Sequence, residues 1–156
     1  MKSLLRLFLF IGFLVLSVAA CSSKDSEAGS SGVLKPVAGQ LQIPLAKVSD
    51  GKSHHYQVKA DDGTMVTFFV LKSADGVLRA AIDACDVCYR SGLGYYKEGD
   101  KMVCKNCGQK FASNKINVIK GGCNPAPLER SVVGDILVIQ MKDINMNSWY
   151  MKYRQS

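Results

Sequence analysis

The sequence predicts a mainly β protein: a small antiparallel β-sheet domain with two Cys-x-x-Cys knuckles forming a metal site, and a minor helix. Two observations support this fold class. Short segments rich in β-branched and aromatic residues alternate with turn sequences such as Asp61-Asp62-Gly63, a pattern typical of antiparallel strands joined by tight turns. In addition, two Cys-x-x-Cys pairs are separated by 15 residues, a spacing typical of thiolate metal sites.

The chain begins with the pattern of a secretory signal peptide. Lys2 and Arg6 form a short positive region, residues 4–18 are largely apolar, and two small residues follow at Ala19-Ala20. The apolar run is shorter than the roughly 20 residues that a membrane-spanning helix needs. We therefore expect residues 1–20 to be a cleaved lipoprotein signal peptide.

The expected cleavage site has a particular form. Val18-Ala19-Ala20-Cys21 resembles the lipobox of bacterial lipoproteins, which makes Cys21 the expected lipidation site, with acyl chains such as palmitate. Several acyl chains on one residue hold a protein durably at a membrane. We expect a lipid-anchored protein of the cell membrane or outer membrane, facing the periplasm or the exterior. Residues 21–35 would be the lipidated Cys and a flexible tether, and residues 36–156 the Cys-rich metal-binding domain.

Charge and motif content argue against several function classes. Without the two basic residues of the signal peptide, 18 Lys and Arg remain against 13 Asp and Glu, a net charge of +5. The excess is spread along the chain without a basic block, so no nucleic-acid partner is expected. No carboxylate pair, Ser/His/Asp arrangement or phosphate-binding Gly loop is evident. We therefore do not expect an enzyme.

Strands are expected wherever β-branched and aromatic residues recur between turn sequences. The first three should form a meander, and the last is the weakest. The expected strands cover residues 54–60, 64–71, 76–84, 135–141 and 148–153. The minor helix is expected as a single helical turn within residues 113–120, ended by Gly121-Gly122.

The third strand leads into the first Cys pair. Alternate residues from Leu78 to Ala84 share one face of this strand, which puts Arg79 and Asp83 on the other face. The strand then delivers Cys85 at its end. Because a further short extended segment ends in the second pair, both pairs are expected at strand ends.

The four paired thiols have the spacing of a tetrahedral metal site. Two residues between paired cysteines let each pair wrap an ion from a tight turn, and the longer loop brings the second turn to the first. Gly108 supports a knuckle, because it can take the positive φ needed after the second pair. The candidate ligands are Cys85, Cys88, Cys104 and Cys107.

Disulfides are the main alternative, because exported proteins meet oxidants. Two bridges across two-residue gaps would close only short loops and add little stability. Removing Cys21 also leaves five thiols, an odd number. The fifth is Cys123 in the segment GGCNPAPL, which could enter the site or serve as a small buried residue. Haem attachment is disfavoured, since neither pair is followed by His.

Other residues near these positions are expected to be structural. His54 and His55 are neighbours on one strand, so one points inward, and an inward His is more often a hydrogen-bonded core residue than a ligand. Tyr89, Tyr95 and Tyr96 are expected to pack around the site.

Four motifs carry a family resemblance. In order and spacing they resemble the C-terminal domain of FtrD-like membrane iron-sulfur proteins over about residues 54–141. The motifs are ACDVCY at 84–89, Gly94-Tyr95, VCKNCGQKF at 103–111 and GGCNP at 121–125.

The resemblance implies a cofactor and a partner. Relatives are associated with ferrous-iron transport, and their cysteines are iron-sulfur ligands, a role that the matching motifs carry to Cys85, Cys88, Cys104, Cys107 and Cys123. The expected cofactor is an iron-sulfur cluster or a single Fe, with zinc as the alternative. The expected function is electron transfer or iron handling with an envelope iron-transport or redox protein. The alternative is a thiol-disulfide redox protein in which Cys123 resolves the pairs.

Overall fold

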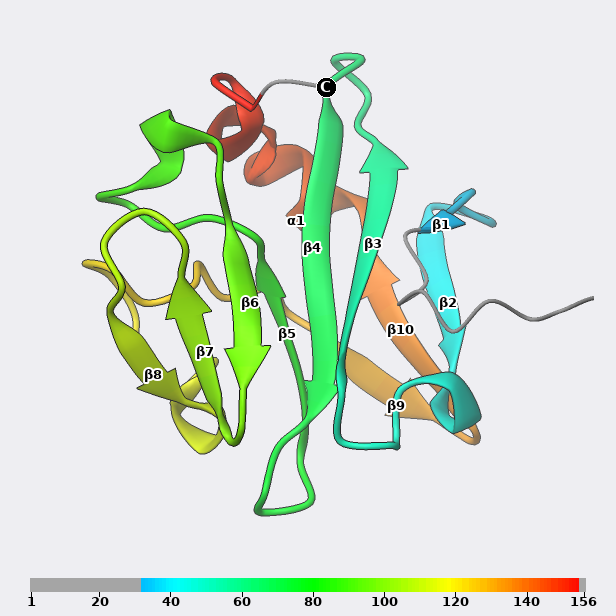
Figure 1. The fold of residues 1–156 in the computed structure, drawn as a ribbon. Helices are drawn as coiled ribbons and strands as arrows, with labels where there is room; N and C mark the ends of the chain where they lie inside the picture. Colours follow the sequence, from blue (N-terminus) through cyan, green and yellow to red (C-terminus); the bar gives the residue numbers. More distant parts are fainter. Residues whose placement is uncertain (1–31, 155–156) are drawn as a thin grey trace, which may run out of the picture.

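The computed structural model describes residues 32–154, and within them the protein is mainly β (Figure 1). The strands are β1 (Gly32–Val33), β2 (Gln40–Pro44), β3 (Ser53–Lys59), β4 (Met65–Lys72), β5 (Leu78–Ile82), β6 (Tyr95–Glu98), β7 (Lys101–Cys104), β8 (Lys110–Ala112), β9 (Ser131–Val133) and β10 (Ile136–Gln140). One α-helix, α1 (Met141–Met146), accompanies four 3₁₀ helices: η1 (Leu45–Lys47), η2 (Tyr89–Ser91), η3 (Ser113–Lys115) and η4 (Ser148–Met151).

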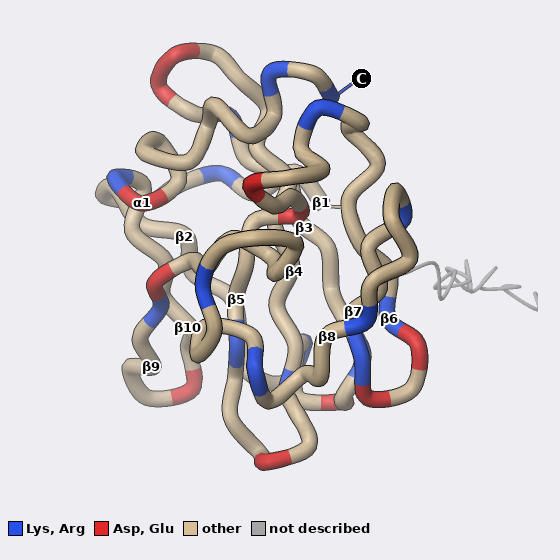
Figure 2. The backbone as a smooth tube through the Cα atoms, turned by 90° about the vertical axis from the view of Figure 1, so that its left-hand side faces the viewer, with Lys and Arg blue, Asp and Glu red and all other residues tan. Residues whose placement is uncertain are grey.

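The strands form three sheets that stack as layers. The central sheet has the order β1-β3-β4-β5, and it lies between a sheet of order β2-β10-β9 and a hairpin sheet of order β6-β7-β8. Figure 2 shows the three layers side by side, with Lys, Arg, Asp and Glu intermixed on the loops rather than gathered by sign. The mainly antiparallel β architecture predicted from the sequence is confirmed.

The predicted meander is the core of the central sheet. Strands β3, β4 and β5 pair antiparallel in chain order. The first turn forms as its residues predict, because Asp62 Oδ1 accepts a hydrogen bond from the Thr64 backbone N–H at 2.9 Å and Gly63 takes a φ of +87°. At the other edge, β1 pairs parallel with β3. Gly32 and Val33, which lie inside the segment expected to be a tether, therefore take part in strand pairing.

Each face of the central sheet contributes to a different hydrophobic core. One face, with residues such as Phe68 and Ile82, packs with the β2-β10-β9 sheet and the C-terminal helices. The other face, with Phe69 and Ala81, packs with the β6-β7-β8 sheet and with three of the cysteines. Because both of its faces are covered, β4 has six consecutive buried residues.

Two sequence-based expectations of secondary structure differ from the structure. The strand expected over 148–153 is wrong: η4 occupies this segment, because Tyr150 and Met151 pack into the core while Ser148 Oγ bonds to Asp62 Oδ2 at 2.8 Å. The helical turn expected within 113–120 is limited to η3, since Asn117 adopts a left-handed φ of +64°. Within residues 32–154, no helix is long and apolar enough to cross a membrane.

Candidate metal centre

The five candidate cysteines of the described residues meet at one end of the β6-β7-β8 sheet, although three separate stretches of chain carry them. Cys85 and Cys88 follow β5, Cys104 ends β7, Cys107 lies in the turn before β8, and Cys123 lies in the loop between η3 and β9. Cys21 lies outside the described residues. We call the five thiols the thiol cluster.

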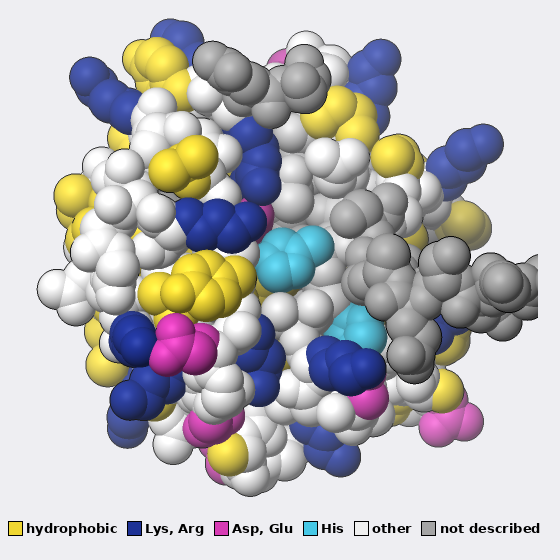
Figure 3. All heavy atoms as spheres, in the orientation of Figure 1, with side chains coloured by type: hydrophobic (Ala, Val, Ile, Leu, Met, Phe, Trp, Pro, Cys, Tyr) yellow, Lys and Arg dark blue, Asp and Glu magenta, His cyan; other side chains and the backbone are white. Residues whose placement is uncertain are grey.

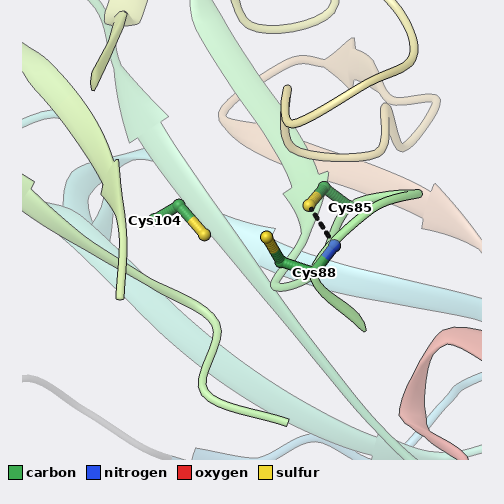
Figure 4. A group of neighbouring side chains, drawn as sticks. All are labelled: Cys85, Cys88 and Cys104. Atoms are coloured by element: carbon green, nitrogen blue, oxygen red, sulfur yellow. Dashed lines mark hydrogen bonds between the residues drawn. The ribbon is translucent and has the colours of Figure 1, made fainter. Parts of the chain in front are cut away.

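The thiol cluster consists of two overlapping groups of three. In the inner group, Cys85, Cys88 and Cys104 are all buried and their sulfur atoms lie within 4.8 Å of one another. Figure 4 shows these three sulfur atoms turned toward a common point. In the outer group, Cys88 lies within the same limit of exposed Cys107 and half-buried Cys123. Cys88 therefore links the two groups, and Cys107 shares its group with Cys123.

The first knuckle holds its sulfur atoms by backbone hydrogen bonds. The backbone N–H of Cys88 donates to Cys85 Sγ at 3.2 Å (Figure 4). The Tyr89 N–H donates to the Cys85 carbonyl at 3.1 Å, which closes the turn, and η2 follows directly. An N–H that points at sulfur stabilises a thiolate, so this turn is suited to a metal ligand.

The second knuckle forms where the sequence placed it. The N–H of Gly108 donates to the Cys104 carbonyl at 2.9 Å, and Gly108 has the predicted positive φ, at +73°. Asn106 connects the two knuckles, since its Nδ2 donates to Cys88 Sγ at 3.3 Å. The residues within the second pair therefore orient a thiol of the first pair.

The protonation of the thiols depends on their burial. Burial raises the pKa of the Cys104 thiol to about 11, and burial also raises the pKa of the Cys123 thiol. The backbone N–H of Gln109 lowers the pKa of the more exposed Cys107 thiol. Buried thiols of this kind stay neutral at pH 7 unless a cation compensates the thiolate charge, which is what a bound metal ion does.

The loop that carries Cys123 is fixed by Tyr95. Tyr95 is buried, and its hydroxyl donates to the Cys123 carbonyl oxygen at 2.6 Å. Burial raises the pKa of the Tyr95 hydroxyl well above its usual range, so this group remains a donor. Of the three tyrosines expected around the site, Tyr95 packs among the cysteines, Tyr89 packs against Trp149, and Tyr96 is exposed.

Sequence reasoning missed the support that a buried carboxylate gives to the site. Asp83, two residues before Cys85, is 2% exposed. Its Oδ1 accepts the N–H of Tyr95 at 2.7 Å, and its Oδ2 accepts Nη2 of Arg154 at 2.8 Å. The side-chain alternation expected along β5 put Asp83 on the face that the structure buries. That face is buried only because the β6-β7-β8 sheet and Arg154, near the end of the chain, cover it. Gly94 was the available signal, because a side chain there would meet this carboxylate.

The donor set fits a thiophilic metal. Both groups contain sulfur ligands alone, which suits zinc, iron and iron-sulfur clusters and not hard cations such as Mg²⁺. Sulfur atoms bonded at about 2.3 Å to one tetrahedral Zn²⁺ lie about 3.8 Å apart, so separations within 4.8 Å need only a small adjustment to close on an ion.

These features define a small β-sheet domain with a cysteine-rich, metal-binding type of site. Comparison with family models agrees with this class: residues 48–151 match the family described as membrane iron-sulfur containing protein FtrD-like. The chain belongs to this family. The family resemblance inferred from the cysteine motifs is therefore confirmed.

Other comparisons are less informative. No match was found among curated proteins. Among solved structures, the chain is similar to the quaternary ammonium Rieske monooxygenase CntA in complex with an inhibitor, at 14% identity and a TM-score of 0.43. The match covers 64% of this chain and 30% of that chain.

Proposed function

We propose that this protein is a membrane-anchored carrier of an iron-sulfur centre in the cell envelope, and that it transfers electrons to, or handles iron with, a membrane partner. The proposed ligands are Cys85, Cys88, Cys104 and Cys107, with Cys123 as a fifth, exchangeable thiol. The observation that carries the proposal is the convergence of these thiols in a chain of an iron-sulfur family.

The thiols fall into two overlapping groups, an arrangement that a cluster with several iron atoms can accommodate. One tetrahedral ion would draw four sulfur atoms into one group, whereas no group within residues 32–154 includes both Cys85 and Cys107. A cluster distributes its ligands over several iron atoms, so its thiolates need not all be mutual neighbours. When bound, such a cluster supplies one-electron chemistry. Single Fe and zinc remain the alternatives that metal analysis separates.

The position of the thiol cluster supports exchange with a docked partner. Cys107 is exposed, and apolar side chains next to other thiols of the cluster are exposed too: Val87 within the first Cys pair, and Val118 and Ile119 on the loop that carries Cys123. Exposed apolar residues close to a buried centre favour contact with another protein and exclude water from the contact.

The test is metal and sulfide analysis of protein purified without oxygen, together with its absorption spectrum. Cys85→Ser, Cys88→Ser and Cys104→Ser are each expected to reduce metal content to near zero, since each removes a buried sulfur. Val87→Ser is the matched control, because it changes the same knuckle and leaves all thiols in place. Sulfur-to-iron charge-transfer bands support iron, and a colourless stoichiometric ion supports zinc. Wild-type protein without metal would overturn the proposal.

Cys123→Ser decides the role of the fifth thiol. Because Cys123 lies within 4.8 Å of Cys88 and Cys107, loss of metal in this variant would make it a required ligand. Retained metal with a shifted spectrum would make it exchangeable, and an unchanged spectrum would remove it from the ligand set.

A thiol-disulfide redox protein is the second candidate. The observation in its favour is that exposed Cys107 lies close to both Cys88 and Cys123, so oxidation could join it to either thiol. In that case anaerobically purified protein would carry no metal, and a thiol count would show pairs of cysteines reversibly lost on oxidation.

Membrane attachment is proposed to occur through Cys21, which lies outside the described residues. Labelling with a palmitate analogue is expected to mark the wild-type protein, and Cys21→Ser is expected to abolish the label and either block processing or release the protein from membranes. Unchanged labelling of Cys21→Ser would exclude this anchor.

A further inference from the structure

A basic cleft lies beside the thiol cluster. Its volume is about 360 Å³, within the range of about 300–1,000 Å³ that small-molecule sites occupy. Figure 3 shows the same face of the molecule, with the two histidines near its centre and Lys and Arg side chains around them. The residues that carry the argument are His55 and Gln57 of β3, Lys97 of β6, Lys105 of the second knuckle, and Asp83 with Arg154.

The cleft exists because one face of the central sheet is covered only in part. The β6-β7-β8 sheet packs on this face through Phe69 and Leu71 of β4 and Ala81 of β5. Over β3 the same face carries polar side chains, Ser53, His55 and Gln57, instead of apolar ones. This polar stretch forms the floor of the cleft.

The walls carry an excess of positive charge. Lys97, Lys105 and Arg154 line the cleft, against a single acidic residue, Asp83. The Asp83 carboxylate is already bonded to Arg154 and to the Tyr95 N–H. Among the described residues neither lysine forms an ion pair with a carboxylate. The Nζ atom of Lys97 bonds to the Gly99 carbonyl. Two uncompensated lysines on a concave polar surface attract an anion.

The floor contains a polar atom that lacks a partner. Within residues 32–154, His55 Nε2 is the buried side-chain nitrogen or oxygen without a hydrogen bond, and it lies 3.7 Å from Asp83 Oδ1. The expectation of a hydrogen-bonded core histidine is therefore wrong for His55, whose ring instead lies at the edge of the cleft beside Phe69. Unpaired buried polar atoms are costly, so each one needs an explanation, and a bound ligand that accepts or donates a hydrogen bond is one.

We propose that this cleft binds a small organic anion with two or more carboxylate groups. The two lysines would bind separate carboxylates, since one comes from a strand and the other from the knuckle, and Gln57 offers a neutral donor. The cleft exceeds the needs of a single inorganic ion. The proposal does not depend on which metal the thiol cluster holds.

The cleft adjoins the metal centre through shared residues. Lys105 lies between Cys104 and Cys107, and its backbone N–H donates to the Gly94 carbonyl at 3.0 Å. Asp83 lines the cleft and bonds to Tyr95, whose hydroxyl holds the Cys123 loop. A bound anion would therefore lie close enough to change the electrostatic field at the thiol cluster.

The experiment is calorimetric titration of the full-length protein, as purified in detergent, with tricarballylate, a tricarboxylate without the hydroxyl group that promotes iron chelation. Saturable binding is expected, with acetate and inorganic phosphate each at least about tenfold weaker, as expected when one charge-assisted contact is lost. Lys97→Gln and Lys105→Gln are each expected to weaken binding about tenfold for the same reason. Lys110→Gln is the control, because Lys110 is exposed, pairs with Glu98 and lies outside the cleft.

Several outcomes would overturn the proposal. If acetate at equal ionic strength gives the same heat as tricarballylate, the heat reflects charge screening only. If phosphate binds as strongly as tricarballylate, the cleft is a site for inorganic oxyanions. An equal loss in Lys110→Gln would assign the effect to net charge. If Lys105→Gln alters the metal content, Lys97→Gln still decides, because Lys97 is outside the knuckles. Where the centre contains iron, a shift of its absorption spectrum is expected at the same midpoint as the heat.

Discussion

Replacing Gly94 by Ala is expected to destabilise the protein by roughly 4 kcal/mol. Gly94 has a φ of +70°, and an added Cβ would lie 2.3 Å from Oδ2, 2.6 Å from Cγ and 2.7 Å from Oδ1 of Asp83. The left-handed backbone costs a residue with a Cβ about 1 kcal/mol. Because all three carboxylate atoms are too close, rotating the carboxylate does not relieve the clash. Asp83 must therefore leave Arg154 and Tyr95, and breaking a buried charge pair costs about 3 kcal/mol more.

Gly99→Ala is the matched control for this prediction. Gly99 also has a positive φ, +56°, but nothing lies within 4 Å of an added Cβ. Its replacement is expected to cost only the backbone strain of about 1 kcal/mol. Urea unfolding followed by the fluorescence of Trp149, the single Trp of the chain, compares the two variants at equal slope. Equal losses of stability would refute the assignment of Asp83 as the residue that makes Gly94 necessary.

Three further changes test the surroundings of the thiol cluster. Asn106→Ala removes the hydrogen bond to Cys88 Sγ and is expected to weaken metal affinity about tenfold or more in a competition assay with a chelator; unchanged affinity would contradict the link between the knuckles. Asn117→Ala removes bonds at 3.1 and 2.7 Å to the backbone N–H and carbonyl of Ala80 and is expected to cost about 2 kcal/mol in urea unfolding, whereas wild-type stability would show that this contact is dispensable. Metal removal is expected to raise proteolysis within residues 89–100, measured by mass spectrometry of the fragments, because the ligands hold both ends of this segment; an unchanged pattern would show that the sheet alone orders it.

Local sequence patterns predicted five of the ten described strands, namely β3, β4, β5, β7 and β10. Alternation and turn residues placed both ends of β3, β4 and β5 within two residues of their observed positions, because side-chain alternation and glycine turns act over a few residues. The 148–153 segment failed the same reasoning. Its aromatic residues favour a strand locally, but no strand edge is paired with this segment, and the core takes up Tyr150 and Met151 from a 3₁₀ turn.

In the candidate site, too, the local features could be predicted from the sequence and the long-range contacts could not. The Cys pairs and Gly108 could be predicted, because a knuckle is a local structure. Cys123 entered the prediction through the GGCNP motif, and the structure brings its thiol to Cys107 and Cys88. The role of Arg154 could not be predicted, since 71 residues separate it from Asp83. Contacts of that range depend on how the layers stack, which no local pattern encodes.

The order of strands in the central sheet has a consequence for how an anchored molecule would present itself. β1, where the described chain begins, lies at one edge of this sheet, and β5, which leads into Cys85, lies at the opposite edge. Gly32 follows Cys21 by eleven residues, which can span at most about 40 Å. A domain attached through Cys21 would thus be tethered at its β1 side, so the tether would leave the thiol cluster uncovered. Because its reach is comparable to the diameter of a domain of this size, the domain could turn its cysteine side toward the membrane or away from it. We expect the thiol cluster to remain accessible to a membrane partner in the same bilayer as well as to a partner in the aqueous space.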